Sequence, residues 1–267
     1  MRLLTSENGF THVCGHRGHS IGAPENTLAA IQATKDQGGT MCEIDIVLTA
    51  DDEIILLHDL SLERTTSGRG LAGRAPLKTI KGLDAGTWFD PSYAGETVPT
   101  LAEALELGRE LDLGFTVEIK EIERTQRLIE RLLEVLERSN AQERVIILSF
   151  DHVDLLYVRD YIPGIRTEGI THARHADFVA VARRARLDSL SIEFQRYYLD
   201  DARAIHEAGI AIRCHLPVPA KLIAAREAGL DFEEKIGPAL EAGLIDSLSG
   251  DDVRFLRTLV DHHPVES

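Results

Sequence analysis

The chain alternates short apolar runs of the β type with longer stretches of helical periodicity along most of its length. This alternation indicates βα units and a parallel sheet. At 267 residues the chain can bury one sizeable core, and α/β barrels often reach this length as one domain. We therefore predict a single α/β domain over residues 1–267. There are nine candidate strands for the eight places of a barrel, so one is misassigned or lies outside it: 11–16, 41–48, 53–58, 114–120, 144–150, about 164–168, 188–193, 210–215 and 243–249.

Helical patterns fill most of the gaps between these strands. Asn26 or Thr27 is a natural N-cap for a helix that runs to Gln37, and Thr100 caps a helix that runs to about Leu111. The other predicted helices are a long one with leucines from 128 to 136, then 151–160, 177–185, 199–208, 219–228 and about 251–261.

Residues 60–97 fit neither pattern. The run 53–58 follows the run 41–48 too closely for a crossover helix, and the next stretch is rich in glycine and holds the only tryptophan. A stretch this long between periodic segments is usually functional. We predict that residues 60–97 form a small insertion subdomain over the active face.

Acidic side chains follow the same face of two predicted strands. Glu43 and Asp45 are two positions apart within one strand, so both can point the same way. Glu118 lies at the end of another strand, with Lys120 two residues on. Three carboxylates suit Mg²⁺ or Ca²⁺ better than zinc. The alternative is that they are solvated charges at strand ends, the commoner fate of a single acidic residue.

Two histidines also follow short apolar runs, where barrel strands usually carry chemistry. His16 and His58 are candidates for general acid and base, because imidazole titrates near neutral pH. Arg17 offers a planar donor pair for phosphate oxygens, and Lys120 adds a second positive charge. We assign structural roles to the other histidines outside the strand ends: His12, His19, His152, His172, His175, His206, His262 and His263.

Composition excludes several classes of partner. Forty-four acidic residues against 29 basic ones give a net charge of −15, which argues against a nucleic-acid surface. Apolar runs are too short for a membrane span, and the N-terminus turns polar too early for a signal peptide. We expect a cytoplasmic protein without stable membrane association, in which Cys14, Cys42 and Cys214 are free thiols. The oligomeric state stays open.

These residues resemble the glycerophosphodiester phosphodiesterase family, whose pattern His-Arg, Glu-x-Asp, His-Asp is met at 16–17, 43–45 and 58–59. Further similar segments are PENT at 24–27, PTLAEAL at 99–105, VEIK at 117–120 and SFD at 149–151. The resemblance implies a TIM (β/α)8 barrel with a small insertion after an early strand. It also implies one divalent cation, Mg²⁺ or Ca²⁺, on Glu43, Asp45 and Glu118.

The implied reaction is hydrolysis of a glycerophosphodiester to sn-glycerol 3-phosphate and an alcohol. By the same resemblance, His16 activates the attacking hydroxyl, which belongs to water or to the substrate itself, and His58 protonates the leaving oxygen. Arg17 and Lys120 would bind the substrate.

The last third of the chain departs from the family pattern. It has AIRCHLP at 211–217 and GLIDSLSGD at 243–251, with Glu193, Arg213 and His215 near strand ends. These polar groups suggest a sugar-containing phosphodiester as an alternative substrate. A lysophospholipid phosphodiesterase or lyase of similar fold is another alternative, although its apolar rim would consist only of Trp88, Phe89 and Tyr93. A binding module without activity would have lost ligands or histidines, and none is lost.

Overall fold

Eight parallel strands close into a barrel in the computed structural model, which describes residues 2–265. The strand order is β1-β9-β8-β7-β6-β5-β4-β2, and β1 also pairs with β2, which closes the ring. The barrel strands are β1 (His12–Gly15), β2 (Met41–Leu48), β4 (Gly114–Ile119), β5 (Val145–Ser149), β6 (Arg166–Thr171), β7 (Ser189–Glu193), β8 (Ala211–His215) and β9 (Ser247–Gly250). The predicted TIM barrel is confirmed.

The one remaining strand among the described residues, β3 (Ile54–Leu56), lies outside the barrel. It pairs with β2 in the antiparallel direction, from Ile46 opposite Leu56 to Leu48 opposite Ile54. A short antiparallel hairpin needs no crossover helix, which explains the short spacing in the sequence.

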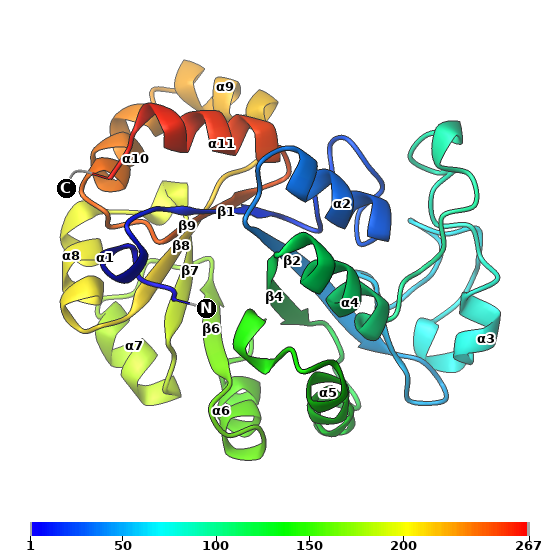
Figure 1. The fold of residues 1–267 in the computed structure, drawn as a ribbon. Helices are drawn as coiled ribbons and strands as arrows, with labels where there is room; N and C mark the ends of the chain where they lie inside the picture. The colour runs from blue at the N-terminus through cyan, green and yellow to red at the C-terminus, as the bar shows by residue number, and fades with distance from the viewer. Residues whose placement is uncertain (1, 266–267) are drawn as a thin grey trace.

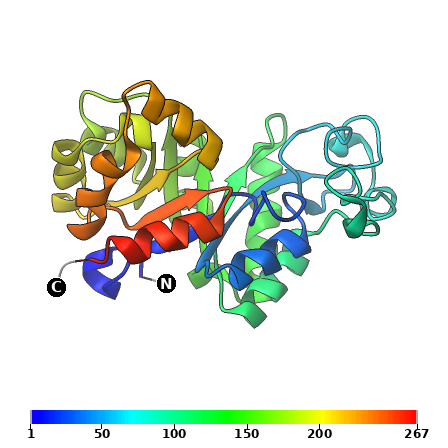
Figure 2. The same cartoon turned by 90° about the horizontal axis from the view of Figure 1, so that it is seen from above.

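Helices surround the barrel in both views (Figures 1 and 2). They are α2 (Leu28–Asp36), α4 (Leu101–Leu111), α5 (Thr125–Ser139), α6 (His152–Tyr161), α7 (Phe178–Ala185), α8 (Leu199–Glu207), α9 (Pro219–Glu227), α10 (Phe232–Glu241) and α11 (Val253–His262), with the single turn α1 (Thr5–Asn8) before β1. Thr27 caps α2 as predicted, by accepting a hydrogen bond from Ala30 N. Thr100 and Glu103 form a capping box at the start of α4.

The structure differs from the sequence prediction at several elements. The last barrel strand, predicted at 243–249, begins only at Ser247 and runs to Gly250. The strand predicted near 164–168 begins at Arg166 and runs to Thr171, because Gly164 turns the chain with φ of +83°. The helix α10 was not predicted. It contains Gly237 and Pro238, which usually interrupt helices, but Asp231 caps its N-terminus and the Gly237 site packs against His263.

Residues 60–97 form a compact segment outside the ring of helices, on the opposite side of the molecule from α10 (Figures 1 and 2). The segment holds the short helix α3 (Leu77–Ile80) and two 3₁₀ turns, Ala72–Arg74 and Pro91–Tyr93. Side chains from this segment and from the β2–β3 hairpin share a small apolar cluster, with Ile80 fully buried. The segment thus has packing of its own beside the barrel.

Among residues 2–265, no helix combines the length and the apolar character that crossing a membrane requires.

Candidate active site

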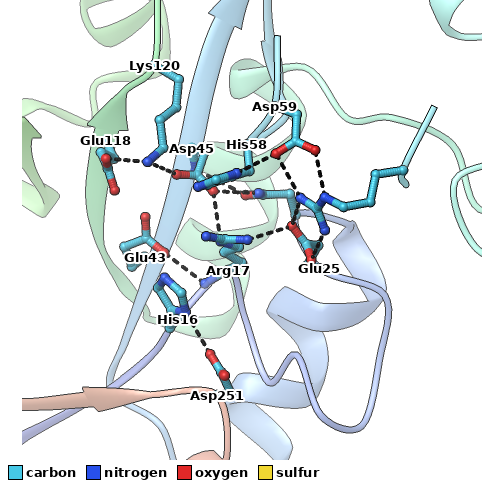
Figure 3. Close-up of polar contacts among 12 residues, drawn as sticks. His16, Arg17, Glu25, Glu43, Asp45, His58, Asp59, Glu118, Lys120 and Asp251 are labelled. Carbon is cyan, nitrogen blue, oxygen red and sulfur yellow. Dashed lines mark hydrogen bonds and ion pairs between the residues drawn. The ribbon is translucent and has the colours of Figure 1, made fainter. Parts of the chain in front are cut away.

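Three carboxylates meet where β2 and β4 pair: two come from β2, and the third lies one residue before the end of β4. Asp45 and Glu118 are direct partners in the parallel ladder, and Glu43 lies two residues before Asp45 on the same face. One oxygen of each lies within 4.8 Å of the others, and all three side chains are buried. Figure 3 shows the three groups side by side.

The chemistry of this cluster suits a hard cation. Glu43 Oε1 and Asp45 Oδ1 are buried oxygens to which no group within residues 2–265 donates a hydrogen bond. Burial, and then repulsion from Asp45, raises the pKa of Glu43 to about 7. Buried carboxylate oxygens without hydrogen bonds are costly, and a divalent cation on an oxygen ligand set would satisfy them. The three residues therefore fit one divalent cation.

The second oxygen of each β2 carboxylate is held from the loop after β1. Glu43 Oε2 accepts a hydrogen bond from Arg17 N at 2.8 Å, and Asp45 Oδ2 accepts one from Asn26 Nδ2 at 2.8 Å. Both Arg17 and Asn26 adopt a left-handed backbone, with φ of +57°. Gly18 also has positive φ and leaves no room for a Cβ, which would lie 2.5 Å from that of Ala30. Close packing of α2 against this loop thus fixes the carboxylates.

Two cationic side chains adjoin the cluster. Lys120 Nζ pairs with Glu118 and lies 3.5 Å from Asp45 Oδ1. Burial opposes the charge of this ammonium, but Asp45 and Glu118 raise the net pKa of Lys120. Arg17 lies between Asp45 and Glu25 (Figure 3), with ion pairs of 3.3 and 2.9 Å. Both groups can offer positive charge to an anionic ligand.

Each of the two candidate histidines is oriented by its own aspartate. His16 Nδ1 lies 2.6 Å from Asp251 Oδ1, and His58 Nδ1 lies 2.6 Å from Asp59 Oδ1. The pKa values of Asp251 and Asp59 are both lowered, so ionised carboxylates accept from Nδ1–H. Each ring therefore keeps its Nε2 atom for other partners.

The surroundings of His16 favour its protonated form. Burial alone would lower the pKa of His16, but the hydrogen bond to Asp251 and the charge of Glu43 outweigh burial and raise it.

A cavity of about 320 Å³ contains most of these groups. Its first half is formed by His16, Arg17, Glu43, His58, Glu118 and Lys120. Its second half comes from the ends of later strands and is mostly polar: Phe150, Ile170, Thr171, His172, Ser191, Glu193, Arg213 and His215. Among the described residues, none from 60–97 lines it, so the insertion lies beside the cavity and does not cover it.

The second half contains two ion pairs and a histidine contact. Glu193 Oε1 lies 2.8 Å from His172 Nδ1, and both residues line the cavity. Arg213 Nε lies 2.7 Å from Glu168 Oε1, and both side chains are almost fully buried. His215 packs edge-on against His16, with ring centroids 4.9 Å apart. Burial, with the nearby charges of His16 and Arg213, lowers the pKa of His215 to about 3.

Sequence reasoning did not select three of the residues that orient this site. Asp251 lies two residues after the last predicted strand, and this place near a strand end is the signal that could have identified it. Glu25 and Asn26 belong to the segment PENT, which was noted only as a resemblance. The roles of the selected residues stay predictions, although the structure brings them together.

The model of the Glycerophosphoryl diester phosphodiesterase family matches residues 16–216 of this chain. A glycerophosphodiester phosphodiesterase of Caldanaerobacter subterraneus is 39% identical over 157 residues, which cover 58% of this chain and 65% of that protein. A putative glycerophosphodiester phosphodiesterase of Bacillus subtilis is 32% identical over 160 residues, with 60% and 65% covered. The match thus spans just under two thirds of the length of these relatives.

Solved structures extend the similarity over nearly the whole fold. An Oleispira antarctica phosphodiesterase, in complex with the product sn-glycerol-3-phosphate, is 27% identical with a TM-score of 0.81 and covers 96% of this chain and 99% of its own. A glycerophosphodiester phosphodiesterase from Agrobacterium tumefaciens shares the fold, at 24% identity, a TM-score of 0.76 and 93% and 100% coverage. With its barrel, its acidic cluster and its matched region, this chain belongs to the glycerophosphoryl diester phosphodiesterase family.

Proposed function

We propose that this protein hydrolyses glycerophosphodiesters to sn-glycerol 3-phosphate and an alcohol. One observation carries the proposal: a carboxylate cluster, two cationic side chains and two histidines with aspartate partners meet at one cavity, which Glu43 and Glu118 of the cluster line. The named relatives and the product in the Oleispira antarctica structure support the same substrate class.

The acidic cluster would hold one divalent cation, Mg²⁺ or Ca²⁺, on Glu43, Asp45 and Glu118. When bound, such a cation supplies positive charge to the phosphoryl oxygens. Arg17 and Lys120 would bind the same phosphoryl group and stabilise the charge that develops on it.

The histidines would move the two protons of the reaction. His16 Nε2 would accept the proton of the attacking hydroxyl while its oxygen bonds to phosphorus. The bond from phosphorus to the leaving oxygen breaks, and His58 would donate its Nε2 proton to that oxygen. Asp251 would keep the proton of neutral His16 on Nδ1, so that Nε2 is free to accept. Asp59 would support the charge of His58, which must carry a proton on both ring nitrogens to have one to donate from Nε2. The assignment of His16 as base and His58 as acid comes from the family resemblance.

Incubation with glycerophosphocholine tests the proposal. We expect sn-glycerol 3-phosphate and choline in the presence of Mg²⁺ or Ca²⁺, and little turnover in excess chelator. A transient ³¹P signal of a five-membered cyclic phosphate would identify attack by a substrate hydroxyl, whereas its absence would favour direct attack by water. Full activity in chelator would contradict the metal-dependent scheme.

A second candidate is a phosphodiester whose leaving group carries several hydroxyls, such as a sugar or polyol. The polar second half of the cavity favours it, because Ser191, Glu193 and His172 can hydrogen-bond hydroxyls. Comparison of kcat/KM for glycerophosphoinositol and glycerophosphocholine decides between them. Faster turnover of glycerophosphocholine would remove this candidate.

A cytoplasmic location stays a prediction from the sequence. Cys14, Cys42 and Cys214 are free and buried, which agrees with a reducing compartment.

A further inference from the structure

Arg64 belongs to the insertion, yet its guanidinium contacts two carboxylates of the catalytic face. Its Nε atom lies 2.6 Å from Asp59 Oδ2, and Nη2 lies 3.2 Å from Asp59 Oδ1. On its other side, Nη1 and Nη2 lie 2.7 and 2.8 Å from the two oxygens of Glu25. Arginine's planar fork suits such double contacts, which fix angle as well as distance.

Each of these carboxylates contacts a different candidate site residue. Asp59 accepts the hydrogen bond from His58 Nδ1 at 2.6 Å. Glu25 accepts one from Arg17 Nη1 at 2.9 Å. A continuous chain of contacts thus runs from His58 through Asp59, Arg64 and Glu25 to Arg17.

Charge supports this arrangement. The hydrogen bonds from Arg64 are the first cause that lowers the pKa of Asp59 to about 2. Burial would raise the pKa of Glu25, but Arg64 and then Arg17 lower it. Without Arg64, Asp59 and Glu25 would lose the cation that they share, and only Arg17 would still pair with Glu25.

We infer that Arg64 is a positioning residue that fixes the placement of His58 relative to Arg17. The two residues lie on separate loops, after β3 and after β1, and Arg64 bridges the carboxylates that hold them. The inference rests on the proposed function, in which Arg17 binds the phosphoryl group and His58 protonates the leaving oxygen.

If Arg64 only anchored the insertion, removal of another anchor should have the same effect on activity. The insertion is also attached through Lys81, whose Nζ lies 2.9 Å from Glu103 Oε2 and 3.1 Å from Val98 O. Lys81 contacts none of the catalytic carboxylates. Lys81→Ala therefore removes an anchor of the insertion without touching His58, Asp59, Glu25 or Arg17, and serves as the matched control.

The experiment compares Arg64→Ala, Arg64→Lys and Lys81→Ala with the wild type. We expect kcat of Arg64→Ala to fall by about tenfold to a hundredfold, since small misplacements of reacting groups have effects of this size. Methylguanidinium should restore part of the lost rate, and Arg64→Lys should be intermediate because one ammonium cannot reproduce both double contacts. Lys81→Ala should keep its kcat, even if its melting temperature falls.

A second measurement does not depend on the substrate. With ¹⁵N-labelled histidine, the Nδ1–H signal of His58, assigned through His58→Gln, should shift in Arg64→Ala and stay in place in Lys81→Ala. An unshifted signal, or equal effects of the two substitutions on kcat, would overturn the inference. An inactive wild type would instead contradict the proposed function, and the histidine signal would still decide the role of Arg64.

Discussion

Asp251 follows His16 by 235 positions in the chain, and its Oδ1 atom lies 2.6 Å from His16 Nδ1. The contact follows from the strand register, because Gly15 at the end of β1 lies opposite Gly250 at the end of β9. His16 and Asp251 are therefore the first residues beyond two paired strand ends. The last barrel strand supplies the partner of a histidine that belongs to the first.

Asp251→Asn should lower both the pKa of His16 and the activity. The folded-state pKa of His16 is raised above 6.5, so its contribution to stability is full below about pH 6.5 and is lost as pH rises through the folded value. We expect Asp251→Asn to lower the melting temperature more at pH 6 than at pH 9. Turnover should fall by about a hundredfold through misorientation of the ring. An NMR titration of His16 checks the pKa, and an unchanged midpoint would contradict this prediction.

Removal of either candidate catalytic imidazole should abolish most turnover while the fold remains. We expect His16→Ala and His58→Ala to lower kcat by about a hundredfold to ten-thousandfold, the usual contribution of a general acid or base. The exposed His262 in α11 provides the control, because His262→Ala should leave kcat unchanged. Circular dichroism and kinetics together check the result. Wild-type rates in both imidazole variants would exclude the proposed proton transfers.

Glu43→Gln should weaken binding of the divalent cation. Saturation at a hundred times the dissociation constant should stabilise the wild type by about 2.7 kcal/mol. The variant keeps an acceptor for Arg17 N but loses one negative charge, so its melting temperature should respond little to Mg²⁺ or Ca²⁺. Calorimetric titration measures the affinity directly. The same response in the wild type, Glu43→Gln and the surface control Glu110→Gln would show that the cation binds elsewhere.

Breaking the buried pair between Glu168 and Arg213 should be costly. Glu168→Leu leaves the guanidinium of Arg213 buried without its partner, and such losses are about 3–5 kcal/mol in the free energy of unfolding. Glu168→Leu combined with Arg213→Met should lose less than the single change. Urea unfolding measures both. The exposed pair of Glu106 and Arg109 is the control, since solvent screens such a pair and Glu106→Gln should leave the free energy of unfolding almost unchanged.

Much of the fold was accessible from the sequence because local patterns determine it. Helical periodicity and capping residues located α2 and α4 to within one or two residues, and continuous apolar runs located the buried strands. The antiparallel pairing of β3 could not be predicted, since a short apolar run does not indicate which strand it pairs with or in which direction. The helix α10 was missed because burial against neighbouring elements offsets the weak helix propensity of Gly237 and Pro238.

In the candidate site too, contacts set by local sequence could be predicted and contacts made by the fold could not. Glu43 and Asp45 could be paired from the period of a strand, which is a local rule. The partners of the histidines differ: Asp59 is adjacent to His58 in the sequence, whereas Asp251 reaches His16 only through closure of the barrel. Arg64 could not be selected, because its two carboxylates belong to different loops.

Barrel closure also sets an order of events during translation. Of the eight barrel strands, β9 is the last to leave the ribosome, and β1 lacks one of its two neighbours until then. A nascent chain that ends before residue 251 carries His16 without its aspartate, even when the whole family-matched region has been made. Under the proposed function, the newly made chain should therefore stay inactive until the last barrel strand emerges, and a premature stop codon just beyond that region should yield a chain without a finished site.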